Sequence, residues 1–93
     1  MPVNPDEQQK HLIHVVTPVY PEAARQAGIE GDVSLRIMIG QNGAVSRASV
    51  LSGEPVLARA AAQAVEQWHY EPALLDGSPV NVVTTVTLAF RLR

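Results

Sequence analysis

Residues 31–50 read GDVSLRIMIGQNGAVSRASV, and this stretch decides the fold. From Asp32 to Gly40 apolar and polar side chains alternate, which is the period of a β-strand with one buried and one exposed face. The positions expected to face the core are Val33, Leu35, Ile37 and Ile39, and those expected to face solvent are Ser34, Arg36 and Met38. The stretch therefore predicts a strand of a sheet that is covered on one side.

A tight hairpin is predicted to follow this strand. Asn42 and Gly43 accept the positive φ angles that a type I′ turn requires, so the next strand, Ala44 to Leu51, should lie antiparallel to the first. The apolar positions of this second strand are Val45, Ala48 and Val50. Because their period slips by one residue near Arg47, we expect a bulge there.

Two helices are predicted, one before and one after the hairpin. The first runs from Pro21 to Ala27, because proline suits the first helical position and Gly28 can end the helix with a positive φ. The second opens near Pro55 and cannot continue past Glu71-Pro72. Its apolar stripe consists of Leu57, Ala61, Ala64, Val65 and Trp68, at the spacing of a helix face that packs on a sheet.

The C-terminal part predicts a turn and one long strand. Asp76-Gly77 forms the turn, and Val80 to Arg93 is expected to be the last strand of the sheet. Its alternating positions on one face are Val82, Thr84, Val86, Leu88, Phe90 and Leu92. Near the N-terminus, His11 to Val16 predicts a short extended segment, for which the sequence leaves the pairing partner open. The expected fold class is α+β, an antiparallel three- to four-stranded sheet with two helices packed on one face.

Length and charge limit the function. The chain has 93 residues, a net charge of -2 and no cysteine. Residues 1–10 are expected to be a flexible lead-in or linker remnant and residues 11–93 a single domain. The negative charge argues against nucleic acid, and the absence of cysteine leaves both periplasm and cytoplasm open. No apolar run is long enough to cross a bilayer, so this chain by itself is expected to be soluble.

The sequence gives no sign of a metal, a cofactor or a catalytic centre. His11 and His14 fall on opposite faces of the expected strand, and His69 is distant in sequence, so no metal site is predicted. No nucleophile motif and no placed pair of carboxylates is present. We expect a protein that is not an enzyme and binds no cofactor.

Several short motifs occur in a fixed order along the chain. They are Pro18-x-Tyr20-Pro21-x-x-Ala24, Gly28-Ile29-x-Gly31-x-Val33, Asn42-Gly43-x-Val45, Ser52-Gly53, Trp68-His69-Tyr70-x-Pro72-Ala73 and Asp76-Gly77-x-Pro79-Val80. Together they extend from about residue 15 to residue 92, and in this order they resemble the C-terminal domain of TonB-type energy transducers. Several members of that family carry basic residues beside the Tyr-Pro motif, where this chain has Val15, Ala23 and only Arg25.

The resemblance implies a periplasmic domain of an inner-membrane-anchored protein. Such a protein couples an inner-membrane proton-driven complex to outer-membrane transporters for siderophores or cobalamin, through an N-terminal membrane helix and a proline-rich spacer that this sequence does not contain. The family's partner is an extended N-terminal transporter segment that adds to the last strand. The matching positions are Val80, Asn81, Val82, Val83, Thr84, Thr85, Val86 and Thr87, with Thr17, Tyr20 and Pro21 around the Tyr-Pro motif.

An alternative to transporter binding is self-assembly. A long final strand at a sheet edge offers unpaired backbone groups, which a second copy could pair with as readily as a peptide could. The alternative predicts a homodimeric interaction module without receptor coupling. Both hypotheses use the same strand.

Overall fold

The elements follow the predicted order, with three short strands in addition. The computed structural model describes residue 8 and residues 10–92, so the lead-in predicted for residues 1–10 lies almost wholly outside the described residues. In chain order the elements are β1 (Leu12–His14), α2 (Glu22–Ala27), β2 (Gly31–Ile39), β3 (Val45–Ser52), α3 (Pro55–Val65), β4 (His69–Tyr70), β5 (Ala73–Leu75), β6 (Ser78–Val80) and β7 (Val82–Phe90).

The main sheet has three antiparallel strands in the order β3-β2-β7. The four alternating apolar residues of β2 predicted to face the core are fully buried, and the intervening residues are half-buried or exposed. β2 is the central strand, so both of its edges are paired. The alternation predicted from residues 31–50 is confirmed.

The loop between β2 and β3 differs from the predicted type I′ turn. Gly43 has a φ of 86°, whereas Asn42 is not among the described residues with a positive φ. The Gly40 and Ala44 backbones close a three-residue loop, with the Gly40 amide donating to the Ala44 carbonyl at 2.8 Å. This is the loop in which an ordinary turn is followed by a left-handed glycine. The hairpin prediction is confirmed, but the turn type is wrong.

β3 is irregular along its length. Its pairing with β2 shifts between Val45 and Arg47 and shifts again between Val50 and Ser52. Each shift leaves one extra residue in β3, which is the definition of a bulge and bends the strand. The bulge predicted near Arg47 is confirmed, and the second bulge had not been predicted.

α3 covers one face of the sheet. The predicted stripe of α3 and Trp68 is buried, although Trp68 lies beyond the last helical residue, Val65. The helix begins with Glu54 as its N-cap, since the Glu54 carboxylate accepts from the amides of Val56 and Leu57 at 2.9 and 3.3 Å. This side chain satisfies two amides that the helix leaves unpaired.

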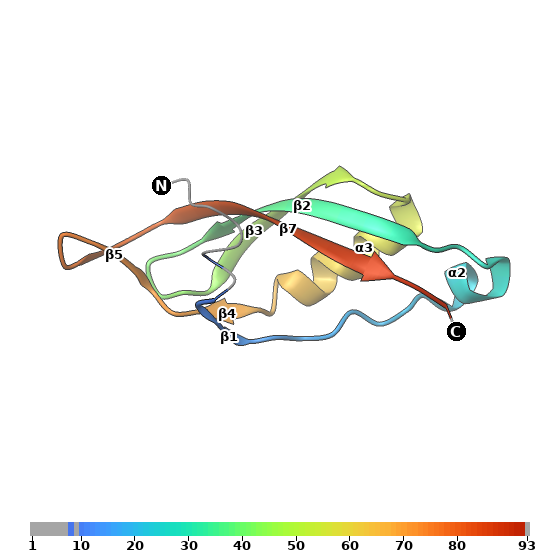
Figure 1. The fold of residues 1–93 in the computed structure, drawn as a ribbon, viewed down its shortest axis with the longest axis horizontal. Coiled ribbons are helices and arrows are strands. Elements are labelled where there is room, and N and C mark those ends of the chain that lie inside the picture. The colour runs from blue at the N-terminus through green and yellow to red at the C-terminus, as the bar shows by residue number, and fades with distance from the viewer. Residues whose placement is uncertain (1–7, 9, 93) are drawn as a thin grey trace.

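α2 lies at one end of the molecule, as Figure 1 shows. Gly28 ends it in the left-handed region with a φ of 70°, as predicted, whereas Pro21, predicted as its first helical residue, is the extended N-cap before Glu22. Ala24 is fully buried and belongs to the core. The short helix therefore closes the end of the core rather than lying along the sheet.

β1 pairs with β4, which answers the question of its partner that the sequence left open. Leu12 pairs with Tyr70, and the Glu71 amide donates to the His11 carbonyl at 2.8 Å. After β1, residues 15–20, here called the connecting segment, run toward α2. The Trp68 indole Nε1 donates to the Val16 carbonyl at 2.9 Å, which fixes the connecting segment beside the end of α3.

The predicted single strand from Val80 to Arg93 is wrong in its extent. Val80 belongs to β6, which pairs with β5, whereas Val82–Phe90 form β7, which pairs with β2. The chain changes its partner at Asn81, and β7 ends at Phe90 because Phe90 faces Gly31, the first residue of β2. The face predicted for this strand is correct, since Val82, Thr84 and Phe90 are buried.

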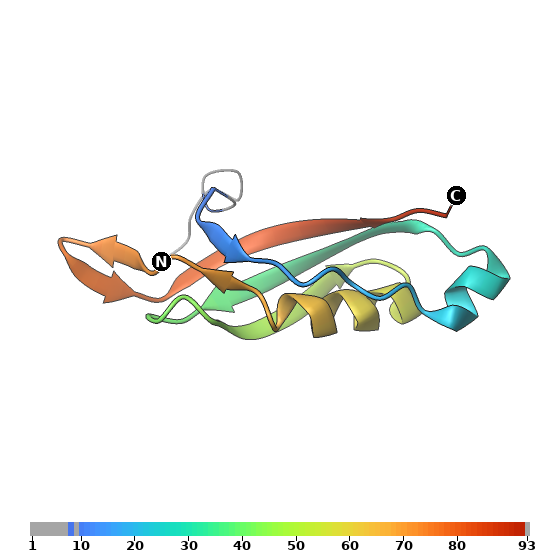
Figure 2. The ribbon, with the colours of Figure 1, turned by 90° about the horizontal axis from the view of Figure 1, so that it is seen from below.

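The molecule is elongated, with extents of 49 × 20 × 19 Å. Figures 1 and 2 show the three long strands along the long axis, with α2 at one end and the β5–β6 hairpin projecting from the other. The two ends therefore present different surfaces to a partner.

Candidate functional site

β7 forms one edge of the main sheet. No strand in the described part of the chain pairs with β7 on the side away from β2. Of the predicted partner-binding residues, six fall on this edge strand: Val82, Val83, Thr84, Thr85, Val86 and Thr87. Val80 instead pairs with Ala73 of β5, and Asn81 lies between the two strands.

The hairpin loop fixes which way the backbone groups of β2 point. The Gly40 amide donates to the Ala44 carbonyl, and the Gly40 carbonyl accepts from the Gly43 amide at 2.9 Å. The backbone groups of Gly40 therefore point toward β3. Because these directions alternate along a strand, the backbone groups of Ile39 point toward β7.

The register transfers this alternation to β7. β2 and β7 pair without a shift from Ile39–Val82 to Gly31–Phe90, so even-numbered residues of β7 direct their backbone groups toward β2. The residues whose backbone groups point away from the sheet are Val83, Thr85, Thr87 and Ala89. The hydroxyls of Ser34 and Thr87 lie 3.2 Å apart, as expected for opposite residues that exchange no backbone hydrogen bond, where side chains are closer.

Sequence reasoning missed Ala89 as part of this edge. The predicted binding range ended at Thr87 because it was carried over from the family resemblance. The alternating pattern continues to Phe90, and this signal would have extended the range to Ala89.

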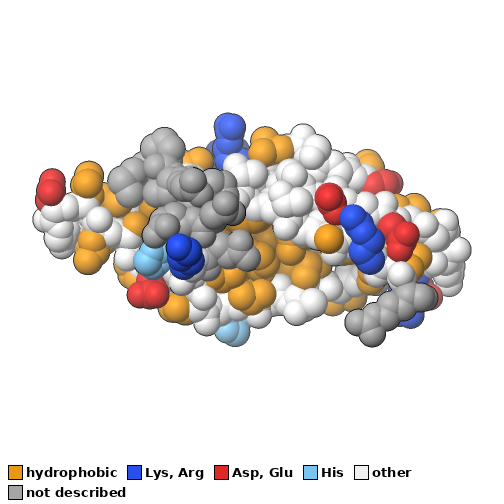
Figure 3. Space-filling model, viewed as in Figure 1, with side chains coloured by type: hydrophobic (Ala, Val, Ile, Leu, Met, Phe, Trp, Pro, Cys, Tyr) orange, Lys and Arg blue, Asp and Glu red, His pale blue; other side chains and the backbone are white. Residues whose placement is uncertain are grey.

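The face of β7 toward the core is closed at its ends and more open in the middle. Val82 and Phe90 are buried, whereas Val86 and Leu88 are half-buried and pack against the core. Figure 3 shows hydrophobic side chains gathered in the middle of this face of the molecule. A strand added to the outer edge of β7 would have an apolar surface beside it.

Tyr20 holds the C-terminal end of β7. Its ring packs edge-on against Phe90, with centroids 5.6 Å apart and an interplanar angle of 80°, and its hydroxyl donates to the Ile29 carbonyl. Desolvation raises the pKa of the Tyr20 hydroxyl, and the nearby Glu30 carboxylate adds to the increase. Tyr20 therefore has a packing role, which does not prevent its outer edge from contacting a partner.

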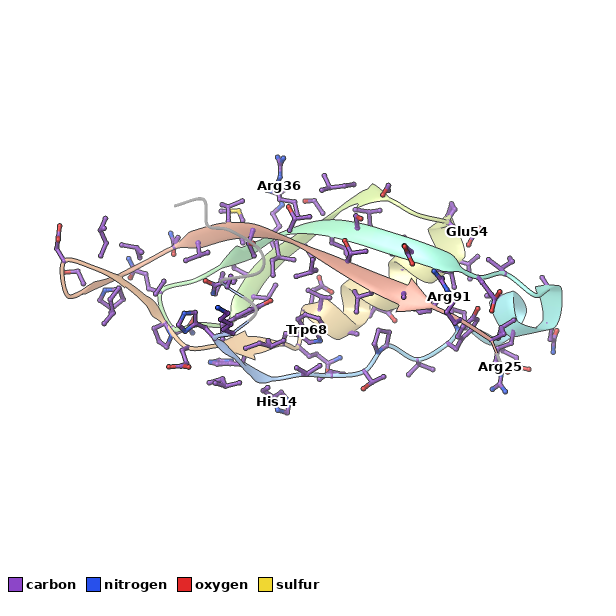
Figure 4. The ribbon with its side chains drawn as sticks, viewed as in Figure 1. His14, Arg25, Arg36, Glu54, Trp68 and Arg91 are labelled. Carbon is purple, nitrogen blue, oxygen red and sulfur yellow. The ribbon has the colours of Figure 1, made fainter. Side chains whose placement is uncertain are left out.

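The end of the molecule beside Tyr20 carries two arginines. Tyr20, Arg25, Arg91 and Leu92 line an open depression of about 300 Å³, and Figure 4 shows both arginines at this end. Arg91 pairs with Asp32 at 2.9 Å, and both side chains are more than half exposed. Such a pair contributes little to stability.

Pro21 and Thr17 face a different surface from the β7 edge. Pro21 lines an open groove of about 440 Å³ between the connecting segment and α3, together with Val19, Pro55, Val56, Arg59, Ala60 and Gln63. Thr17 lines a smaller hollow that continues the groove along α3. The predicted site residues are thus divided between the β7 edge and this groove.

The three histidines lie in or beside the β1–β4 pair. His14 and His69, distant in sequence, are opposite each other in the β1–β4 pair. His11 Nδ1 lies 3.8 Å from Glu71 Oε1, and His69 Nε2 lies 3.1 Å from the Asn42 carbonyl. Among residue 8 and residues 10–92, no three metal-ligating side chains come together. Over the same residues, the helices are too short or too polar to traverse a bilayer.

The chain is similar to known TonB proteins in sequence. The profile of the family described as Gram-negative bacterial TonB protein C-terminal matches residues 16–92. The chain is 37% identical over 79 residues to Protein TonB of Vibrio cholerae and 32% identical over 77 residues to Protein TonB of Pseudomonas aeruginosa. These matches cover 83% and 81% of this chain but only 32% and 22% of the relatives, so the chain spans about a third or less of their length.

Solved structures agree with the sequence comparison. The solution NMR structure of the Pseudomonas aeruginosa TonB CTD superposes with a TM-score of 0.73 and 30% identity, covering 87% of this chain and 84% of that one. The TonB2 protein from Vibrio anguillarum gives 0.66 and 32%, covering 92% of this chain and 84% of that one. The α+β fold is confirmed, and the chain belongs to the family of Gram-negative bacterial TonB C-terminal domains.

Proposed function

We propose that this domain is the periplasmic partner-binding part of a TonB-type energy transducer. It binds an outer-membrane transporter by adding an extended N-terminal segment of that transporter to the outer edge of β7. Membership of the TonB family supports the transducer role. The whole protein would couple the inner-membrane proton-motive force to uptake of a siderophore or cobalamin, through an N-terminal region that joins an inner-membrane proton-driven complex.

The observation that carries the proposal is the difference between the two edges of the sheet. The register of β3 with β2 shifts twice, near Ser46 and near Leu51. Bulges of this kind make an edge strand less able to pair with another strand. β7 keeps one register with β2 from Val82 to Phe90. A regular edge can form successive backbone hydrogen bonds with an added strand, so β7 is the better docking strand.

The side chains beside the edge explain how a partner would be selected. In strand addition the backbone hydrogen bonds provide affinity, and pockets for alternate side chains provide selectivity. Alternate side chains of the added strand would lie beside the half-buried Val86 and Leu88. The others would lie on the opposite face, beside Thr85 and Thr87. A transporter segment with apolar side chains at alternate positions fits this edge.

Thr17, Tyr20 and Pro21 are proposed as secondary contacts. Tyr20 packs on Phe90 at the end of β7, so a partner that continues past Phe90 would reach the depression lined by Tyr20 and Arg25. Thr17 and Pro21 lie on the groove beside α3, and only a larger part of the partner could contact them.

Two proline substitutions on neighbouring residues test the strand addition. Thr85→Pro removes an amide that points away from the sheet, and proline is tolerated at such edge positions. We expect Thr85→Pro to fold and to lose at least about tenfold in affinity for a synthetic N-terminal peptide of a transporter from the same genome. Isothermal titration calorimetry measures the affinity, and circular dichroism verifies the fold.

Thr84→Pro is the matched control for the fold. It removes an amide that points toward β2, so it should lower the free energy of unfolding by about 3 kcal/mol or more. Full peptide affinity in a folded Thr85→Pro variant would contradict docking on this edge. The same variants test the backbone alternation, since equal destabilisation by the two prolines would show that the assigned directions are wrong.

Self-assembly remains the second candidate, because the same regular edge could pair with a second copy. It predicts a dimeric mass at low micromolar protein that Thr85→Pro converts to a monomer. A monomeric wild-type domain leaves the edge available to a transporter. Sedimentation velocity on the two proteins separates the candidates.

A further inference from the structure

β5 and β6 form a hairpin that projects beyond the main sheet, here called the β5–β6 arm (residues 73–80). Figures 1 and 2 show it extending past every other described element at the end opposite α2. Asp76 and Gly77 at its tip have φ angles of 52° and 81°, so the tip is a type I′ turn. This turn sets the arm as a regular two-stranded ribbon of three residue pairs.

The arm exposes large apolar side chains. Leu74 and Leu75 are 62% and 53% exposed, and Pro79 is also exposed. Only its base joins the core, through the half-buried Ala73. A lone two-stranded hairpin is at best marginally stable in water. Apolar residues gathered on such a projection are characteristic of surfaces that bind another protein.

The arm is suited to docking through side chains rather than through its backbone. In a type I′ hairpin the residues that flank the turn, Leu75 and Ser78, are hydrogen-bonded to each other. Leu74 and Pro79 therefore direct their backbone groups outward, and they share one face because they are paired. Proline has no amide to donate, so the outer edge of β6 offers no donor to an added strand.

The position of the arm indicates its partner. β6 and β7 are separated by Asn81 alone, so the arm continues the line of the β7 edge. A transporter segment lying on β7 would bring the rest of the transporter alongside one of the two ends of that edge. The end near Phe90 carries charged residues, Arg25, Glu30, Asp32 and Arg91, whereas the arm end carries exposed leucines.

A second copy is a poorer occupant of the arm. Pairing of two arms through β6 would lack the donor at Pro79, and prolines on edges hinder such pairing. The acidic Asp76 at each tip would also oppose a tip-to-tip contact. An apolar surface on a protein other than this chain therefore fits the arm better than a second copy does.

We propose that the β5–β6 arm is a second contact surface for the same transporter that adds a strand to β7, and that the arm face carrying Leu74 and Pro79 packs on an apolar patch of its periplasmic side. The inference rests on the proposed function. It adds a site that recognises the folded transporter rather than its extended segment. Isolated peptide and intact transporter should therefore respond differently to changes in the arm.

The test uses the double variant Leu74→Ser/Leu75→Ser. Both side chains are exposed, so their replacement should leave the fold intact. We expect about tenfold weaker binding to the detergent-solubilised transporter, the loss typical of removing a central apolar contact. Affinity for the N-terminal peptide of the same transporter should stay within about twofold of wild type. Surface plasmon resonance measures both.

Val50→Ser/Leu51→Ser is the matched control. These residues of β3 are 48% and 50% exposed and lie on the opposite edge of the sheet, so this variant should bind both ligands like wild type. Wild-type affinity of the arm variant for the intact transporter, with peptide binding preserved, would overturn the arm proposal and leave the strand proposal standing. A wild-type domain that does not bind the peptide would overturn both the arm proposal and the strand proposal. A wild-type dimer that the arm variant converts to a monomer would assign the arm to a second copy instead.

Discussion

Among the glycines of the described residues, Gly43 has the least room for a side chain. A Cβ at this position would lie 1.9 Å from the Tyr70 carbonyl oxygen, and the φ of 86° is one that other residues rarely adopt. The close approach accompanies the hydrogen bond from the Tyr70 amide to the Gly43 carbonyl at 2.8 Å. Gly43 thus joins the β2–β3 loop to β4.

Gly43→Ala should lower the free energy of unfolding by more than about 3 kcal/mol, because backbone atoms must move to admit the methyl group. Gly77→Ala is the control, with a similar φ of 81° and nothing within 4 Å of the added Cβ. It should cost only about 1 to 2 kcal/mol for the left-handed conformation. Urea unfolding of both variants measures the difference, and equal losses would contradict the close contact.

Tyr70 gives the domain an alkaline limit. Burial raises the pKa of its hydroxyl from the usual 10.0 to about 12. As pH rises, Tyr70 therefore ionises in the unfolded chain before it ionises in the folded domain. The stabilisation that the folded domain gains from keeping Tyr70 neutral is fully present below pH 10 and is lost as pH rises toward 12. Tyr70→Phe should remove most of this alkaline decline, as measured by urea midpoints between pH 8 and pH 12. Parallel curves for variant and wild type would refute the assignment.

At the scale of elements, α3 depends on an unusual cap. Glu54 provides the side-chain acceptor that Ser, Thr, Asp or Asn more often provides, and the amides of Val56 and Leu57 donate to it. Glu54→Ala should lower the free energy of unfolding by about 1 kcal/mol. Thermal unfolding measures the loss.

Glu66 at the other end of α3 is the control for this prediction. Its negative charge sits at the C-terminal, negative end of the helix dipole. Glu66→Ala should therefore be neutral or slightly stabilising. Equal losses at Glu54 and Glu66 would mean that the cap contributes nothing specific.

Local signals predicted the elements better than their details. The alternation of apolar residues predicted β2, helical spacing predicted α3, and glycine placement predicted the β2–β3 hairpin and the turn at Asp76-Gly77. The type I′ turn occurs at Asp76-Gly77 rather than at Asn42-Gly43, because the loop at Gly43 also has to meet Tyr70. That contact joins residues far apart in sequence, and no local pattern records it. The interruption of the predicted last strand at Asn81 also depends on pairing between strands, since the chain there changes its partner from β5 to β2.

At the scale of the whole molecule, the connecting segment closes the core. The hydrogen bond from the Trp68 indole to the Val16 carbonyl joins residues 52 positions apart in sequence, and Figure 4 shows Trp68 beside α3. Trp68→Phe removes the donor and part of the buried ring. We expect it to lower the free energy of unfolding by about 2 kcal/mol.

The control for Trp68→Phe is Val15→Ala on the same segment. Val15 is 53% exposed, so its truncation should change the free energy of unfolding by no more than about 0.5 kcal/mol. Denaturant unfolding followed by circular dichroism suits both variants. A neutral Trp68→Phe would mean that the connecting segment is not held by this bond.

The candidate site could be located from sequence only in part. The family resemblance placed it on the last strand, but the two edges could not be ranked without the bulges of β3 and the strand order. Which amides of β7 point outward depends on its register with β2, a long-range pairing. The arm was not predicted, since only a turn at Asp76-Gly77 was expected before a strand beginning at Val80; the pairing of β5 with β6 is separate from that of β7 with β2.

The central claim is that the outer edge of β7 accepts an added strand, and amide hydrogen exchange during an NMR titration tests it directly. The ligand is the synthetic N-terminal peptide of a transporter from the same genome. In the free domain the amides of Thr84, Val86 and Leu88 should exchange slowly, and those of Thr85 and Thr87 should exchange fast. Slow exchange of Thr85 and Thr87 on saturation with the peptide is the predicted result. Continued fast exchange at both residues, with the peptide bound, would contradict the account.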